Sequence, residues 1–278
     1  MRLSVVVTTY NHPEWLEKAL WGFEAQTVRD FELLVADDGS DEPTRELINR
    51  LRPRLGYPVR HIWHAKQGFR KCTILNAAIA ASEGEYLVFT DGDCIPRRDV
   101  LAMHAATAER GRFLSGGYLK LPMETSQAIT REDILAGRST DYSWLREHGT
   151  PASAQARRLH WGPRMARLLD VLTTTRPTFN GHNASAWRDD LVRVNGFDER
   201  LEWGGLDREI GERLENAGVK GTQVRHRSLV VHLDHGRGYK RPEAIARNRA
   251  IRDEVAAKHL VRTPAGLDRH LGHAGSTT

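Results

Sequence analysis

The sequence lacks any long apolar run and contains little cysteine. No stretch approaches the roughly 20 consecutive apolar residues of a membrane-spanning helix, and the apolar run 3–7 is too short for a secretory signal. The two cysteines, Cys72 and Cys94, stand in no zinc-binding pattern and cannot make a disulfide framework. We therefore expect a soluble, cytoplasmic protein, and peripheral contact with the inner face of the membrane stays open.

The chain also lacks a dense block of charge of one sign. Its 278 residues include 41 Lys and Arg against 36 Asp and Glu, which gives a net charge of +5. This excess is compatible with an anionic substrate, an anionic membrane or a nucleic acid. Outside residues 237–252 the basic residues are dispersed, and they do not cluster with interleaved aromatic residues, so we expect no nucleic-acid partner.

The first third of the sequence contains alternating strand and helix patterns. Apolar runs predict buried strands at residues 3–8, 31–36, 59–63 and 86–90. Helical spacing of apolar residues predicts helices at 13–26, 41–51 and 71–82. Repeated strand–helix units predict an α/β fold with a mainly parallel sheet and helices on both faces. Ligands bind at the carboxyl ends of such strands, which form one rim from residues 8–11, 37–40 and 91–93.

The rest of the sequence is less regular. A strand pattern at 113–121 is interrupted by Gly116-Gly117, and residues 125–174 read as short helices and loops. After Pro177 the sequence predicts a glycine-containing turn that leads into a strand. The remaining patterns predict a helix at 208–216, a strand at 228–233 and a basic helix at 241–260. The tail 274–278 is small and polar, and we expect it to fray.

Two acidic turns follow strands on the predicted rim. Asp91-Gly92-Asp93 is a DxD triplet, and two carboxylates separated by one small residue can hold a divalent cation such as Mn or Mg. Asp37-Asp38-Gly39-Ser40 can be a turn with a helix cap, or it can present a carboxylate to a nucleotide base or ribose. Each motif alone is weak evidence, but their common position on one rim makes them mutually supportive.

These motifs belong to a longer pattern. The segments 5–11, 26–27 and 31–40, followed by 75–78, 84–86 and 91–93, resemble in the same order the opening of family two GT-A glycosyltransferases. Segments 194–199 and 203–207 resemble the galactosyltransferase-like acceptor half, which chondroitin-type polymerases share. The usual core of that half is Trp-Gly-x-Glu-Asp or Trp-Gly-x-Glu-Asn. This chain has Leu206 at the first acidic position and Asp207 at the second.

The resemblance implies a GT-A fold, in which a Rossmann-like sheet carries a smaller acceptor-binding half. It implies a nucleotide-sugar-binding half at 1–110 and an acceptor-binding and catalytic half at 111–240. A basic helix and tail at 241–278 complete one compact domain. The partners it implies are a nucleotide sugar, a UDP-sugar first of all, and a carbohydrate or lipid-linked glycan acceptor.

The resemblance also assigns donor-binding roles. Thr8, Tyr10 and Asp38 would surround the base and ribose, and Asp91 would contact the ribose or bind metal through water. Two further groups follow: the cations Arg70 and Lys71 near the diphosphate, and Asn180, His182, Asn183 and Trp203 around the sugar. Four of these residues also have a purely structural interpretation. Tyr10 and Trp203 could be aromatic residues of the hydrophobic core, and Arg70 and Lys71 could be solvent-exposed residues at the start of a helix.

The remaining roles concern metal and catalysis. Asp93 would ligate the divalent cation with His232 as a third ligand, and His235 is the rival of His232. Asp207 would act as catalytic base, or it could be only the cap of the helix at 208–216. A sugar hydroxyl is a poor nucleophile, so a carboxylate must accept its proton, and the metal would stabilise the leaving diphosphate. One such displacement inverts the anomeric carbon. With Leu206 the pocket would be less polar than in relatives.

Two other functions stay open. A sugar nucleotidyltransferase should carry a Gly-rich, Arg-containing loop after its first strand, where this chain has residues 9–13, Thr-Tyr-Asn-His-Pro. A relative that binds nucleotide sugars without catalysis is the second alternative.

If the protein is a glycosyltransferase, the missing membrane helices and Gln-x-x-Arg-Trp motif argue against a processive synthase. The expected acceptor is a bacterial surface polysaccharide or lipopolysaccharide. The arginines of the last helix would then face anionic lipid; they are Arg241, Arg247, Arg249 and Arg252.

Overall fold

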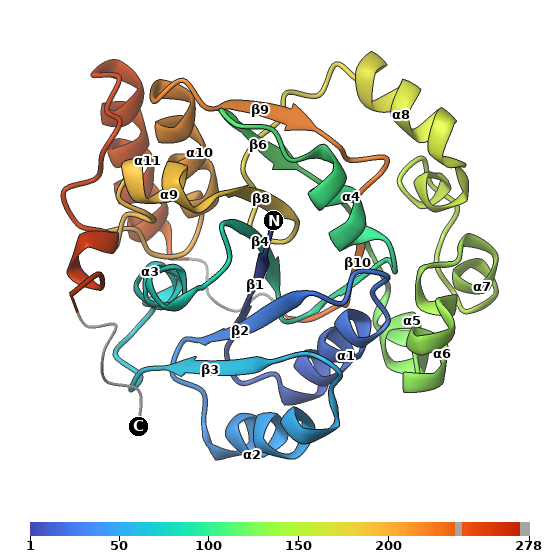
Figure 1. The fold of residues 1–278 in the computed structure, drawn as a ribbon. Helices are drawn as coiled ribbons and strands as arrows, with labels where there is room; N and C mark the ends of the chain where they lie inside the picture. The colour runs from blue at the N-terminus through green and yellow to red at the C-terminus, as the bar shows by residue number, and fades with distance from the viewer. Residues whose placement is uncertain (237–240, 273–278) are drawn as a thin grey trace.

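A computed structural model describes residues 1–236 and 241–272, which form an α/β fold (Figure 1). The predicted fraying of 274–278 therefore lies outside the described residues, as does Arg237 at the start of the basic region 237–252. Both cysteines are free and buried. In the described parts of the chain, no helix is long and apolar enough to cross a membrane.

The main sheet has seven strands in the order β3-β2-β1-β4-β8-β6-β9. Only β8 runs antiparallel to its neighbours, so the predicted, mainly parallel sheet is confirmed. The strands are β1 (Leu3–Thr9), β2 (Phe31–Asp37), β3 (Val59–Trp63), β4 (Tyr86–Asp91), β6 (Arg112–Ser115), β8 (Ala184–Trp187) and β9 (Lys220–Gln223).

Helices cover both faces of this sheet (Figure 1). They are α1 (Pro13–Glu24), α2 (Glu42–Leu51), α3 (Lys71–Ala81), α4 (Val100–Thr107), α5 (Met123–Ala128), α6 (Arg131–Ala136), α7 (Tyr142–Glu147), α8 (Pro163–Leu172), α9 (Arg188–Arg193), α10 (Leu206–Asn216) and α11 (Pro242–Ala257). Short 3-10 helices lie at Arg52–Arg54, Arg138–Thr140, Ala156–His160 and Leu267–Arg269. The strands and helices predicted in the first hundred residues agree with the structure within two residues at each end.

Two hydrophobic cores explain the continuous apolar strands. In β1, Val5 and Val7 point into a core shared with α1, whereas Val6 points into a second core shared with α3 and α10. Successive side chains of a strand face opposite sides of the sheet. A strand with both faces covered is therefore apolar at every position, as β1 is.

The predicted strand at 113–121 is two strands in different sheets. β6 lies in the main sheet, and β7 (Gly117–Lys120) joins a small sheet with β5 (Cys94–Pro96) and β10 (Leu229–His232), in the order β5-β10-β7. The change of partner falls at the two glycines, where the Gly116 N–H donates to the Asn183 carbonyl and the Gly117 N–H to the Ser228 carbonyl. The small sheet places His232 opposite Cys94, beside the DxD turn.

The helix predicted at 208–216 begins two residues earlier, at Leu206. Asp207 therefore lies inside the first turn of α10 and is not its cap, which corrects the alternative reading of this residue. Leu206 is buried in the second core, where its side chain packs under the start of α10. The predicted basic helix at 241–260 is α11, which packs on α10.

Candidate active site

The carboxyl ends of β1 and β4 meet in a three-residue cluster at the rim of the sheet. Thr8 and Asp91 are register partners, and the Thr8 hydroxyl donates to Asp91 Oδ1 at 2.7 Å. Lys71, the first residue of α3, places its Nζ 2.7 Å from the same oxygen. Burial alone would lower the pKa of Lys71 and raise that of Asp91, but their mutual attraction outweighs it in both. The two side chains therefore form an ion pair, and Lys71 is not an unpaired phosphate ligand.

A second cluster follows β2, around the buried carboxylate of Asp38. Its oxygens lie 2.8 Å from His64 Nε2 and 3.0 Å from Lys66 Nζ. Burial alone would raise the pKa of Asp38, but these hydrogen bonds outweigh it and hold the pKa below its usual value. Lys66 Nζ also lies 3.6 Å from the centre of the Tyr10 ring, a cation–π contact. Tyr10 is exposed and not a core aromatic.

His64 and Lys66 were not among the sequence candidates. Both follow β3 directly, so the rule that ligands bind at the carboxyl ends of strands could have included them. Arg70, which was a candidate, uses its backbone N–H to donate to Asp38 and its guanidinium to donate to Gln67. Its contribution to the cluster is thus a main-chain one.

Asp93 of the DxD turn lies between two histidines from the end of β10. His235 Nε2 is 3.0 Å from Asp93 Oδ2, and His232 Nε2 is 3.7 Å from Oδ1. In each histidine, Nδ1 contacts a backbone carbonyl, that of Leu233 or Gly236, and so Nε2 is left facing the carboxylate. A carboxylate and two imidazoles oriented by their Nδ1 atoms fit a divalent cation.

Cys94 completes the group of potential ligands around Asp93, since Asp93, Cys94 and His232 have ligand atoms within 4.8 Å of one another. Burial and the neighbouring carboxylates raise the pKa of the Cys94 thiol well above its usual value. The thiol is therefore protonated without a metal, and the oxygen and nitrogen donors make the better set for Mn or Mg.

Glycine is required at position 92 of the DxD turn because the backbone there packs closely against β1. A Cβ atom there would lie 2.9 Å from the Thr8 carbonyl oxygen, which accepts the Gly92 N–H at 2.7 Å. No side chain fits so close an approach of two backbones. The glycine thus holds both aspartates against the end of β1.

Asp207 reaches the same rim from α10. Its Oδ1 atom is buried and has no hydrogen-bond partner among the described residues. Burial raises the pKa of Asp207 to about 6, against the opposing influence of Lys71. Lys71 interacts electrostatically with Asp91, Asp207 and Asp93, so one ammonium group lies among the three acidic groups predicted from sequence. A carboxylate near pKa 6 can accept a proton at neutral pH.

A buried ion pair holds α10 against the preceding motif. The side chains of Arg213 and Glu209 are fully buried and lie 2.6 Å apart. The Arg213 guanidinium also donates to the carbonyls of Val194 and Gly196. The segment 194–199, which carried the resemblance, therefore positions the helix that bears Asp207.

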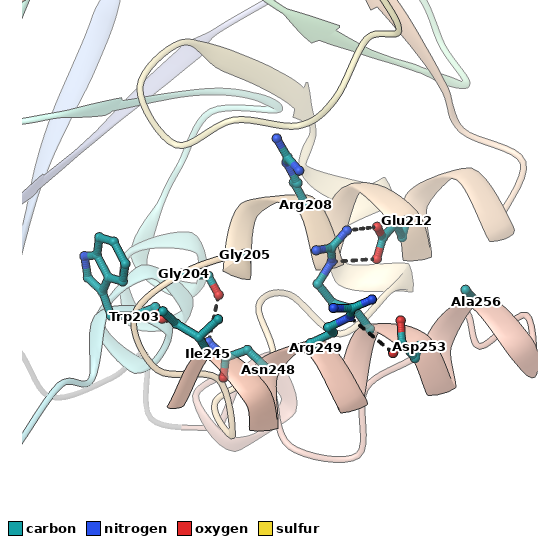
Figure 2. Close-up of a pocket in the computed structure, with 11 residues that line it drawn as sticks. Trp203, Gly204, Gly205, Arg208, Glu212, Ile245, Asn248, Arg249, Asp253 and Ala256 are labelled. Atoms are coloured by element: carbon teal, nitrogen blue, oxygen red, sulfur yellow. Dashed lines mark hydrogen bonds and ion pairs between the residues drawn. The ribbon is translucent and has the colours of Figure 1, made fainter. Parts of the chain in front are cut away.

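Two residues that were predicted to bind the donor sugar have other contacts in the structure. Asn183 is buried, and its amide bonds with the Gly117 and Ser228 carbonyls and with His104, so it has no spare group for a donor sugar. Trp203 lines a groove of about 660 Å³ between α10 and α11 (Figure 2). None of the residues lining this groove comes from β1, β2 or β4.

The loop before β8 supplies two further candidates. His182 lies 4.4 Å, centre to centre, from the Tyr118 ring, and burial lowers its pKa to about 4 despite nearby Asp91. It is therefore neutral at pH 7. Asn180 accepts the Asn183 N–H and donates to Ser115, so it shapes the loop.

Gly181 in this loop leaves room for the Asp207 carboxylate. An added Cβ would lie 2.8 Å from Asp207 Oδ1 and 3.0 Å from Oδ2. We expect Gly181→Ala to lower kcat by about tenfold to a hundredfold, because small misplacements of reacting groups are costly. Donor affinity should stay near the wild-type value, which steady-state kinetics and calorimetry can check. Gly162→Ala is the matched control, since nothing lies within 4 Å of its added Cβ. Unchanged kcat in Gly181→Ala would contradict this placement.

Comparison with known proteins identifies the family. The profile of "Glycosyl transferase family 2" matches residues 4–189, and that of "N-terminal domain of galactosyltransferase" matches residues 172–236. The chain therefore belongs to glycosyl transferase family 2, and the predicted galactosyltransferase-like second half is confirmed.

The relatives carry several activities. Validoxylamine A glucosyltransferase of Streptomyces hygroscopicus is 28% identical over 86% of this chain and 57% of its own length. Chondroitin synthase of Escherichia coli is 26% identical over 81% of this chain and 34% of its own length. The chain thus spans about half the length of the first of these relatives, and less of the second.

Solved structures confirm the GT-A fold. A mannosyltransferase of Pyrobaculum calidifontis, in complex with GDP-Man and Mn2+, superimposes with a TM-score of 0.56, 22% identity and coverage of 93% of this chain and 62% of that one. TarS 1-349 of S. aureus in complex with UDP gives 0.60, 16% identity and coverage of 99% and 70%. At these identities the likeness concerns the fold alone.

Proposed function

We propose that this chain transfers a sugar from a UDP-sugar to a hydroxyl of a glycan acceptor, with inversion at the anomeric carbon. The observation that carries the proposal is the placement of Asp207: its Oδ1 atom is buried, its pKa is raised, and it interacts electrostatically with Lys71, as the DxD aspartates also do. The solved relatives that hold UDP, UDP-GlcNAc or GDP-Man support a nucleotide-sugar donor.

The clusters at the rim would bind different parts of the donor. Tyr10 is exposed and can stack on the base, and Asp38, held in its charged form by its neighbours, would accept from the base or ribose by exchanging one of its present donors. Asp93, His232 and His235 would hold a divalent cation, Mn or Mg, and Asp91 is a further candidate. Such a cation, when bound, would stabilise the charge of the leaving diphosphate as a Lewis acid.

Asp207 performs the proton transfer in this proposal. The acceptor hydroxyl attacks the anomeric carbon while the bond from that carbon to the diphosphate oxygen breaks. The hydroxyl proton passes to the Asp207 carboxylate, whose Oδ1 is unpartnered among the described residues. Lys71 limits the rise in the pKa of Asp207, so the carboxylate is ionised at neutral pH before the reaction begins.

The proposed acceptor is a growing bacterial surface glycan, of polysaccharide or lipopolysaccharide type, which receives one sugar or a few per encounter. A Campylobacter jejuni relative that is 30% identical over 33% of this chain is named for glucosyl transfer to an undecaprenol-linked glycan. Peripheral contact with the membrane belongs to the same proposal, because such acceptors are lipid-linked.

The test is release of UDP from a panel of UDP-sugars, with and without Mn, by the wild type and Asp93→Ala. We expect slow, metal-dependent UDP release from one sugar, and a loss of at least about a hundredfold in Asp93→Ala. Asp189→Ala, which removes an exposed carboxylate on α9, is the control and should behave as the wild type.

Two other results would support one of the alternative functions instead. Donor binding without release or transfer, even with varied acceptors, would identify a binding-only relative. Consumption of UTP with a sugar 1-phosphate would identify a sugar nucleotidyltransferase. A chain that binds no nucleotide sugar with either metal would overturn the proposal.

A further inference from the structure

Helix α8 exposes an apolar face to solvent. Of the ten large hydrophobic side chains that are exposed in residues 1–236 and 241–272, four lie on this ten-residue helix. They are Met165, Leu168, Val171 and Leu172, with exposed fractions of 49%, 49%, 77% and 64%. The buried residues of α8, Ala166 and Asp170, point the opposite way at 3.6 residues per turn. The outward face of α8 thus carries four large apolar side chains, with Arg164 among them, whereas an ordinary surface helix turns such side chains toward the core.

Positive charge lies on and beside this face. Arg164 and Arg167 of α8 and Arg157 before it are exposed, and the described residues provide no ion pair for any of them. The only acidic residue between 157 and 172 is Asp170, which is buried and bonded to His226 and Arg227. An apolar stripe bordered by unpaired arginines is complementary to an anionic lipid surface.

Asp170 also ties α8 to the active site. Its carboxylate accepts from the His226 N–H at 2.8 Å and from Arg227 Nε at 2.7 Å. One residue separates these two from β10, which ends at His232 beside Asp93. After α8 the chain runs to Gly181, against Asp207. A surface bound by α8 would therefore hold the reacting residues in a defined orientation.

Three of the four arginines that the sequence placed toward lipid lie on α11 and have acidic neighbours. Arg247 lies 2.5 Å from Glu202, and Arg252 lies 2.5 Å from Glu212. The second pair joins α11 to α10 at Glu212, which Figure 2 labels on α10. Arg249 lies 3.9 Å from Asp253. Arg247 and Arg252 therefore have close acidic partners within the protein, which reduces the charge that they offer to lipid.

We propose that α8 is the membrane-docking element of this protein, and that its apolar face inserts into the interface of an anionic phospholipid bilayer. Leu168 and Val171 would enter the acyl boundary while Arg164 and Arg167 pair with lipid phosphates. The inference deepens the proposed membrane contact and rests on the proposed function only for the location of the acceptor. Lipid binding needs neither donor nor acceptor and can be measured separately.

The test is co-sedimentation with vesicles of phosphatidylcholine containing phosphatidylglycerol, compared with phosphatidylcholine alone. We expect the wild type to bind the anionic vesicles in about 0.1 M salt and to dissociate largely at about 1 M, where the screening length falls from about 10 Å to about 3 Å. The double variant Leu168→Glu/Val171→Glu should bind at least about tenfold more weakly.

Ile245→Glu on α11 is the matched control, because Ile245 is also exposed, and it should bind as the wild type. Circular dichroism and UDP release should be unchanged in both variants, since the substituted side chains lie on the surface. Absence of wild-type binding to anionic vesicles, or equal binding by the α8 variant, would overturn the proposal. A concentration-dependent dimer that the α8 substitutions abolish would overturn it in favour of a second copy of the chain as the occupant.

Discussion

Asp207→Asn is expected to transfer sugar about 10²–10⁴-fold more slowly than the wild type at neutral pH, with donor affinity unchanged. The substitution keeps the shape of the side chain but removes the group that accepts the proton of the acceptor hydroxyl. Steady-state kinetics with saturating donor would measure the loss in kcat. Asp189→Asn, on an exposed carboxylate, is the matched control. A variant that keeps wild-type kcat would contradict the proposed role.

The pH dependence follows from the same carboxylate. Burial raises the pKa of Asp207 to about 6, so kcat/KM of the wild type should fall as the pH is lowered through about 6. The raised pKa also means that the protonated form is the stabilising one. Its contribution to stability is complete below the unfolded-state pKa of about 3.8 and is lost as the pH rises through about 6. At neutral pH, Asp207→Asn should therefore melt at the wild-type temperature or a few degrees above it.

Arg213→Met is expected to lower the free energy of unfolding by about 3–5 kcal/mol, because it leaves Glu209 buried without its partner. The Val194 and Gly196 carbonyls also lose their donor. Urea unfolding followed by circular dichroism would measure the change. Transfer should slow as well, since α10 carries Asp207.

The control for this prediction is the double variant Glu209→Leu/Arg213→Met. Replacing both charges by apolar side chains removes the uncompensated charge, so the double variant should be more stable than Arg213→Met alone. A single variant that loses less than about 1 kcal/mol, or a double variant less stable than the single one, would show that the pair does not hold α10 in place.

The first hundred residues could be predicted well because their signals are local. Each buried strand, such as Val5–Val7 in β1, is a continuous apolar run, and each helix shows apolar residues at helical spacing. Parallel strands end at one edge of the sheet, which brought Asp38 and Asp91 to the same rim before any contact was known. Lys66 was missed although the same rule applied to β3.

Side-chain direction was the main source of error. The resemblance placed Asn183 beside the donor sugar, but its side chain is buried. The arginines of α11 formed a basic pattern in the sequence, but most of them pair with acidic residues of the protein. A sequence pattern shows which residues are present. It does not show whether they are buried or paired, because that depends on the residues that pack against them.

The sequence by itself determined the family, the order of strands and helices in the first half, and the acidic turns at the rim. These properties follow from short-range spacing, which the chain carries without reference to distant residues. Only the tertiary structure decided that His232 and His235 face Asp93, that Lys71 lies among three aspartates, and that α8 exposes its apolar face. Each depends on contacts between segments far apart in the chain, such as β5 with β10, whose register no local pattern encodes.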